Sequence, residues 1–220
     1  MNYDTLRENI IKIDQIAKSR NWSTQSDVFI DAIATDKEIT DLENSIRKKI
    51  PIQLKDLLTQ LSKSVQLFYE IEEEVSSEFS KISSGEFYFD LELLEQLNKE
   101  YPDWIAASLD EDANDIESIE ITKRVKDHKT VILEVSTGDL IVMDDQSNEV
   151  LFLDHEGGAM HGKSLAKDLN TFLEQWSLMG FFGTEDWQFE EMYDFEKNSL
   201  KSLNDDKVIR WINWLNNKIS

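Results

Sequence analysis

Apolar residues recur at three- and four-residue intervals at both ends of the chain, a spacing that places them on one face of an α-helix. At the N-terminus this pattern predicts a helix over residues 4–19, with Trp22 packed behind it. Near the C-terminus an apolar stripe predicts a helix over residues 205–218, with its acidic residues first and its basic residues last. The stripe consists of Val208, Trp211, Ile212, Leu215 and Ile219.

A further helix is expected to begin at Thr35, because Thr35 and Glu38 form a capping box. Its apolar positions continue to Ile50, which puts the basic residues 47–49 in its last turn, where they suit the helix dipole. Pro51 is expected to begin the next helix, since proline is tolerated in the first turn.

Two more helical patterns lie in the second half of the chain. Asp90 is a capping residue for a helix that is expected to stop at Pro102. Apolar residues at helical spacing after Ser164 predict a helix that ends near Leu178 and directly follows a glycine-containing loop.

Alternating and continuous apolar runs predict β-strands between these helices. Residues 65–71 alternate between apolar and polar, and residues 86–89 form a second strand pattern. Three apolar runs, 131–135, 140–143 and 150–153, are joined by turns too short for helical crossovers, so they should form an antiparallel meander. Both faces of these three runs are apolar, so we expect the meander to be covered on both sides.

These elements predict an α+β protein with a mainly antiparallel sheet covered by helices. At 220 residues, with two prolines and seven glycines, the chain has no candidate linker, and one domain is expected. We divide it into an N-terminal helical extension (1–36), a central domain (37–195) and a C-terminal helix packed on that domain (196–220).

The net charge of the chain limits the classes of partner that it is expected to bind. With 45 acidic and 23 basic residues the formal net charge is −22, which argues against nucleic acid or an anionic membrane as direct ligand and favours a basic protein partner. Acidity that serves only solubility is an equal alternative.

Cysteine is absent, which excludes disulfides, thiolate metal sites and thiol catalysis. The chain start lacks the features of a signal peptide, and no apolar run is long enough to span a membrane, so a cytoplasmic protein is expected.

The candidate partner-binding residues are Trp104 and the acidic and aromatic residues that cluster in two later segments. Each segment also has a simpler interpretation: the first as a solvated acidic face, the second as a helix that buries one ring edge. As a binding surface, rigid rings would provide anchors and the carboxylates would speed the encounter with a basic partner. The candidates are Trp104, Asp110, Glu111, Asp112, Trp187, Glu190 and Glu191.

A nucleotide enzyme is a competing interpretation of the segment Gly157–Ser164. It matches the phosphate-binding loop pattern, in which Lys163 and Ser164 would contact phosphate and magnesium. That loop requires a parallel sheet, whereas the neighbouring runs predict antiparallel strands, and Asp154 and Glu156 bring charge that repels phosphate.

Other catalytic and metal motifs are incomplete, so no cofactor, metal site or catalytic residue is expected. A calcium-loop pattern that starts at Asp110 lacks its glycine and its final glutamate. The His155–Glu156 pair resembles the start of a zinc motif, but the second histidine is missing. A histidine at a strand end is instead expected to satisfy a local hydrogen bond. No serine lies in the nucleophile-elbow pattern of a hydrolase.

The order of several features resembles one known family. An acidic-start helix leads into an isoleucine–proline turn and a second short helix; later come a Gly-Asp turn, a strand with an acidic end, a strand ending in Asp-His-Glu, and a helix. The residues are Ile39, Leu42, Glu43, Ile46, Ile50, Pro51, Leu54, Leu57 and Leu58, then Gly138, Asp139, Asp144, Asp154, His155, Glu156, Phe172 and Leu173.

Taken together, residues 39–187 resemble the SUKH superfamily of Smi/Knr-type domains, which includes bacterial immunity proteins and fungal cell-wall-assembly regulators. The resemblance implies binding without catalysis, as an immunity protein that blocks a cognate toxin domain. A regulatory adaptor of a cellular enzyme is the alternative within the same family. The second helix lacks the family's usual aromatic–glycine continuation, and both chain ends lie outside the pattern.

Overall fold

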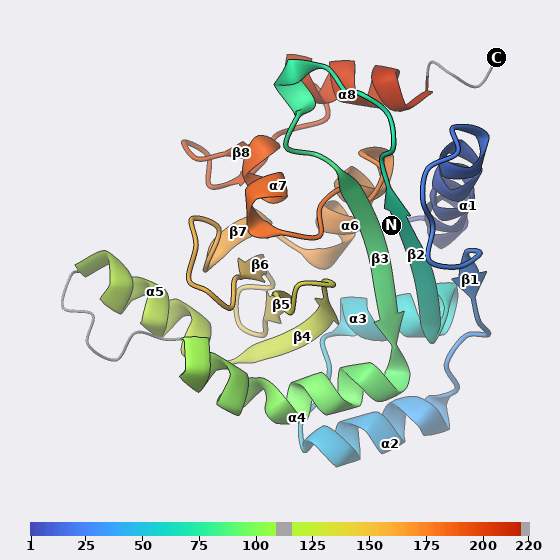
Figure 1. Cartoon of the computed structure of the whole chain (residues 1–220). Coiled ribbons are helices and arrows are strands. Elements are labelled where there is room, and N and C mark those ends of the chain that lie inside the picture. Colours follow the sequence, from blue (N-terminus) through green and yellow to red (C-terminus); the bar gives the residue numbers. More distant parts are fainter. Residues whose placement is uncertain (109–115, 217–220) are drawn as a thin grey trace.

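The computed structural model of the protein describes residues 1–108 and 116–216 and belongs to the α+β class, as predicted (Figure 1). None of the helices within these two ranges is long and apolar enough to cross a membrane. The helices are α1 (Tyr3–Ser19), α2 (Asp36–Ile46), α3 (Ile52–Asp56), the π-helix η1 (Leu57–Leu61), the 3-10 helix η2 (Ser77–Phe79), α4 (Leu91–Ser108), α5 (Ile116–Lys126), α6 (Leu169–Leu178), α7 (Asp186–Glu191) and α8 (Asp206–Asn216). The strands are β1 (Phe29–Ile30), β2 (Ser64–Glu70), β3 (Ser84–Asp90), β4 (Lys129–Glu134), β5 (Leu140–Asp144), β6 (Val150–Leu153), β7 (Lys163–Ala166), β8 (Tyr193–Asp194) and β9 (Ser199–Leu200).

The described strands form three antiparallel sheets instead of the single sheet expected from the sequence. Their orders are β1–β2–β3, β4–β5–β6–β7 and β8–β9. The predicted meander is confirmed, because Val142 of β5 lies opposite Val131 of β4 on one side and Leu151 of β6 on the other. Short turns between these strands leave no room for a crossover, so each strand reverses direction.

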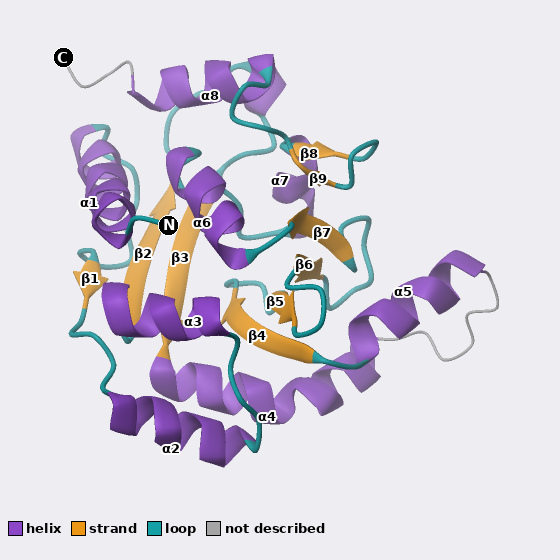
Figure 2. Ribbon diagram, turned by 180° about the vertical axis from the view of Figure 1, so that it is seen from behind, coloured by secondary structure: helices purple, strands orange, loops and turns teal. Residues whose placement is uncertain are grey.

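The sheet β1–β2–β3 has one covered face and one open face. Figure 2 shows α1, α3 and α6 across one face of β2 and β3, and among the described elements no helix lies over the opposite face (Figure 1). The alternation read from the sequence follows this division: Val65, Leu67 and Tyr69 are buried, whereas Gln66 and Phe68 are half-buried. Outward-facing side chains of β2 and β3 therefore line a surface that a ligand can reach.

The meander is covered on both faces, as predicted. Val142 and Leu151 share an apolar cluster with Tyr101 of α4 and Val125 of α5. Neighbours on the opposite face, such as Phe152, belong to the main core, which also contains residues of α1 and α6. The side chains of β4, β5 and β6 are almost entirely removed from water.

Both chain ends contribute to the main core. Ile10 of α1 and Trp211 of α8 are completely buried in it, and β1 extends the sheet of β2 and β3. A cation–π arrangement attaches α8 to the end of α1: the Arg20 guanidinium lies 4.8 Å from the ring centroid of Trp22 and 4.1 Å from that of Trp214.

Helix α2 begins at the predicted capping box but ends earlier than predicted. Thr35 accepts the Glu38 N–H, and the Glu38 carboxylate accepts the Thr35 N–H in return. The helix stops at Ile46 because Arg47 adopts a left-handed backbone with φ of 56° and its N–H donates to the Glu43 carbonyl. The prediction that the basic residues 47–49 form the last turn of this helix is wrong, because they follow its end at Ile46.

Helix α4 begins at Leu91, directly after the predicted capping residue Asp90, whose carboxylate accepts the Glu92 N–H at 2.9 Å. The expected stop at Pro102 is wrong, because the helix continues through it to Ser108. Tyr101 and Ile105 on either side of the proline are both buried. Their packing outweighs the hydrogen bond that a proline removes from a helix.

Helix α6 also depends on a capping side chain. Asp168 accepts the Thr171 N–H at 2.7 Å, which satisfies one of the free N–H groups of the first turn. Replacing Asp168 by alanine is expected to lower the free energy of unfolding by about 1 kcal/mol, measured by urea denaturation. Asp168→Asn keeps the acceptor and serves as the control; an equal loss in both variants would contradict the capping role.

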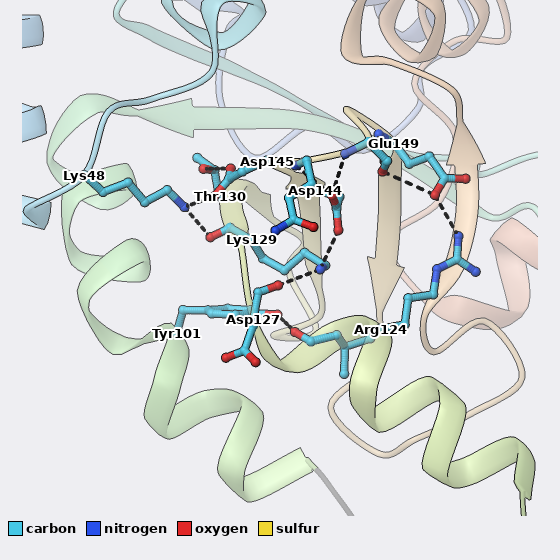
Figure 3. Close-up of polar contacts among 12 residues, drawn as sticks. Lys48, Tyr101, Arg124, Asp127, Lys129, Thr130, Asp144, Asp145 and Glu149 are labelled. Carbon is cyan, nitrogen blue, oxygen red and sulfur yellow. Dashed lines mark hydrogen bonds and ion pairs between the residues drawn. The ribbon is translucent and has the colours of Figure 1, made fainter.

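A buried ion pair connects β4 with β5 (Figure 3). The Lys129 side chain is 2% exposed, and its Nζ donates to Asp144 Oδ2 and to the Asp127 carbonyl, both at 2.7 Å. Nearby, Lys48 Nζ contacts Asp145 Oδ2 at 2.8 Å and the Lys129 carbonyl at 2.5 Å. Lys48, which was expected to lie in the last turn of α2, therefore connects the segment after that helix to the meander.

Candidate functional site

A groove lies on the open face of β2 and β3, beside the turn that connects β4 to β5. Its volume is about 450 Å³. Among the residues that the structure describes, its lining contains no lysine or arginine, although two carboxylates are present. We call it the groove; it is lined by Gln25, Gln66, Leu67, Phe68, Glu86, Tyr88, Glu134, Val135, Ser136, Thr137 and Gly138.

Glu86 is the most buried charged residue of the groove. In β3 the side chains of Phe87 and Phe89 point into the core, so Glu86 and Tyr88 point to the open face. Glu86 is nevertheless only 4% exposed. Burial raises the pKa of its carboxyl to about 7, although hydrogen bonds from the side chain and backbone of Ser136 act in the opposite direction. Close to neutral pH, the protonation of this carboxyl therefore changes.

Glu134 gives the groove a second carboxyl, and Tyr88 gives it an uncharged aromatic ring. Burial and the charge of Glu100 raise the pKa of the Glu134 carboxyl. Burial, Asp90 and Glu134 together raise the pKa of the Tyr88 hydroxyl, although the residue remains 38% exposed. Glu134 also raises the pKa of Glu86, because two nearby carboxylates disfavour each other's ionisation. A cation bound here would relieve that repulsion.

The turn between β4 and β5 joins the groove to a second group of acidic residues. Thr137, which lines the groove, donates to Asp139 Oδ2 at 3.2 Å and to the Thr184 carbonyl at 2.8 Å. Gly138 follows with φ of 91°, a conformation that favours glycine. Its carbonyl accepts the indole N–H of Trp104 at 3.2 Å. The groove and this second group thus share one turn.

Asp139, Asp154 and Asp186 form this second group, which we call the acidic cluster. Asp139 and Asp154 are both nearly inaccessible to water. A Cβ atom on Gly158 would lie 2.2 Å from Asp154 Oδ2 and 2.5 Å from Asp186 Oδ2, so only glycine leaves room for both carboxylates. Burial and then the charge of Asp154 raise the pKa of Asp186.

Two histidines border the acidic cluster, and each makes a local hydrogen bond through Nδ1, as predicted for the strand-end His155. His155 Nδ1 lies 2.7 Å from Asp139 Oδ1, and this hydrogen bond raises the pKa of the imidazole. His161 Nδ1 lies 2.8 Å from the Asp154 carbonyl, and burial lowers the pKa of its imidazole. The fold therefore favours the protonated imidazole at His155 and the neutral imidazole at His161.

Ligand atoms of Asp139, Asp154 and His155 lie within 4.8 Å of one another, a geometry that can hold a metal ion. The carboxylate oxygens already accept hydrogen bonds: Asp139 from the His155 N–H at 3.0 Å, and Asp154 from the N–H groups of Glu156 at 2.7 Å and Gly158 at 2.6 Å. These bonds shape the loop after β6 without a metal, so the geometry is explained by the loop alone.

The structure places the predicted partner-binding residues in different surroundings. Trp104 of α4 and Trp187 of α7 are both half-buried; Trp104 contacts the turn between β4 and β5, and Trp187 donates to Glu185 at 2.7 Å. Glu190 pairs with Lys81 at 3.1 Å, and Glu191 pairs with Lys207. Asp110, Glu111 and Asp112, with the calcium-loop pattern that begins there, lie outside the described residues.

The phosphate-loop geometry is absent from the segment Gly157–Ser164. The predicted helix directly after the loop is wrong: Lys163 and Ser164 belong to β7, which pairs antiparallel with β6, and α6 begins only at Leu169. A phosphate loop needs its lysine and serine at the N-terminus of a helix. The repeated reversal of direction through β4, β5, β6 and β7 leaves no such helix here.

Sequence reasoning missed the groove. It placed Glu86 in a strand, but strand alternation alone predicts an exposed carboxylate at this position. The burial of Glu86 arises when the turn at Ser136, about fifty residues later in the sequence, covers it. Glu134 lies near the end of an apolar run in the sequence, so no local pattern identifies either Glu86 or Glu134 as part of a site.

No family model matches the chain, and no curated protein matches it in sequence.

Proposed function

We propose that the protein is a non-catalytic binding protein whose partner is a basic protein domain. The groove and the acidic cluster carry this proposal, because they meet at the turn between β4 and β5. Glu134 and Asp186 are half-buried there, and the carboxyls of Glu86, Asp139 and Asp154 are almost entirely buried beside them. Carboxylates grouped in this way attract a cationic partner and accelerate the encounter. The net charge of −22 adds a long-range contribution of the same sign.

The most specific form of the proposal is an immunity protein that binds a toxin domain and blocks it. Its support is the resemblance to the SUKH superfamily, in which the Gly138–Asp139 turn and the Asp154–Glu156 strand end are part of the pattern. In this protein both segments lie on the proposed binding surface. Trp104 and Trp187 are also available there as half-buried rings that can anchor a partner.

The test is affinity capture from a lysate of the cells that encode the protein, followed by reconstitution of the complex from purified components. We expect a basic partner whose dissociation constant rises at least about tenfold between low and moderate salt, because exposed charges are screened. Expression of the partner alone should arrest growth, and coexpression should restore it. A complex that is indifferent to salt would contradict the electrostatic basis, and a harmless partner would contradict the immunity role.

A further inference from the structure

Glu86 is held in the groove at the expense of stability. Its carboxyl is 4% exposed, and burial raises its pKa to about 7, which means that the ionised form is disfavoured by the fold. A neutral side chain of the same shape would avoid this cost. Strongly perturbed carboxyls that line a concave surface are typical of binding and catalytic sites.

The chemistry around Glu86 suits one kind of ligand. A guanidinium group forms two parallel charge-assisted hydrogen bonds with carboxylates, and its planar face stacks on aromatic rings. The groove provides Glu86 and Glu134 as acceptors and the ring of Tyr88, an exposed residue, as a stacking surface. Its volume of about 450 Å³ is sufficient for a side chain together with the backbone that carries it.

The location of the groove favours a side chain presented by a protein over a small free ligand. The groove is open to solvent on the helix-free face of β2 and β3, as Figure 1 shows for the face itself. A partner protein can therefore lie against this face while one of its side chains enters the groove. The described lining contains no lysine or arginine, so no cation of the groove itself competes for the two carboxylates, and Glu86 accepts hydrogen bonds from the uncharged Ser136.

We propose that the groove receives an arginine side chain of the protein partner, with Glu86 as the buried carboxylate that pairs with the guanidinium and Glu134 as the second acceptor. This inference rests on the proposed function and identifies the part of the partner that the surface recognises.

The test is a titration of protein labelled with carboxyl-¹³C glutamate, at about pH 8, with acetyl-Gly-Arg-Gly-amide. The matched control peptide contains citrulline, which keeps the length and planarity of arginine but has no charge. We expect the NMR signals of Glu86 and Glu134 to shift with the arginine peptide, and the citrulline peptide to bind at least about tenfold more weakly. Equal shifts with both peptides, or shifts confined to glutamates outside the groove, would overturn the proposal.

Two variants complete the test. Glu86→Gln is expected to weaken binding of the arginine peptide, and of the captured basic partner, at least about tenfold. Glu8→Gln, an exposed residue of α1 on the covered side of the sheet, makes the same change of net charge and should leave both affinities unchanged. A salt-sensitive partner complex unaffected by Glu86→Gln overturns this inference while the proposed function stands. Arginine-peptide binding without any basic partner supports the groove and contradicts the proposed function.

Discussion

Replacing Glu86 by glutamine is expected to raise the free energy of unfolding at pH 8 by about 3 kcal/mol, because the pKa of this carboxyl is raised to about 7 from 4.5. Glutamine keeps the shape of the side chain and an oxygen that can accept from Ser136. It removes only the charge that burial disfavours. The substitution is therefore expected to stabilise the fold while it weakens binding.

The raised pKa of Glu86 also determines how the free energy of unfolding depends on pH. Between about pH 4.5 and pH 7 the folded state holds a proton on Glu86 that the unfolded state has released, so stability falls as pH rises through this range. Below that range the wild type and Glu86→Gln should have similar stability. Urea unfolding at pH 4 and pH 8 measures the difference, with Glu8→Gln as the control for net charge. A Glu86→Gln variant that is less stable than wild type at pH 8 would contradict the account.

Replacing Asp144 by asparagine is expected to lower the free energy of unfolding by about 3–5 kcal/mol, because it leaves the Lys129 ammonium buried without its counter-ion. The side chain of Lys129 is 2% exposed, whereas that of Asp144 is 18% exposed. Lys129→Met should therefore cost less, since the carboxylate left behind keeps the N–H groups of Gln146 and Ser147 and some contact with water.

The same ion pair predicts a dependence on acid. Burial opposes ionisation of Asp144, but hydrogen bonds from Lys129, Ser147 and Gln146 outweigh it and lower the pKa of the carboxyl to about 2. Its contribution is thus fully present above its unfolded value of 3.8 and is lost as pH falls through about 2. Chemical denaturation of the wild type and of both variants from pH 7 to pH 2 checks this, because only the wild type contains the intact pair. Equal losses in Asp144→Asn and Lys129→Met would contradict the role of burial.

Local patterns predicted much of the fold. The helix at the N-terminus, the capping box at Thr35 and the antiparallel meander follow from spacing and turn length, which depend on neighbouring residues only. The errors arose where distant contacts decide. Buried neighbours carry α4 through Pro102, and β7 replaces the first turn of the expected helix because Lys163–Ala166 completes a sheet edge on β6.

The candidate site was less accessible to sequence reasoning than the fold. The strand-end residues Asp139, Asp154 and His155 stood out as a motif, and the structure brings them together. Glu86 and Glu134 acquire their character only when β3 and the turn after β4 meet. Residues 110–112, on which much of the predicted binding surface depended, lie outside the described part and stay a prediction.

Hydrogen exchange of the protein, alone and in complex with its captured partner, shows directly whether the groove and the acidic cluster form the binding surface. We expect slower exchange in the complex at the backbone amides of Glu86–Tyr88 and Glu134–Asp139, on either side of the groove. Exchange in α1, on the covered side of the sheet, should not change. Protection confined to α1, or to surfaces away from the turn between β4 and β5, would contradict a binding surface built on the groove and the acidic cluster.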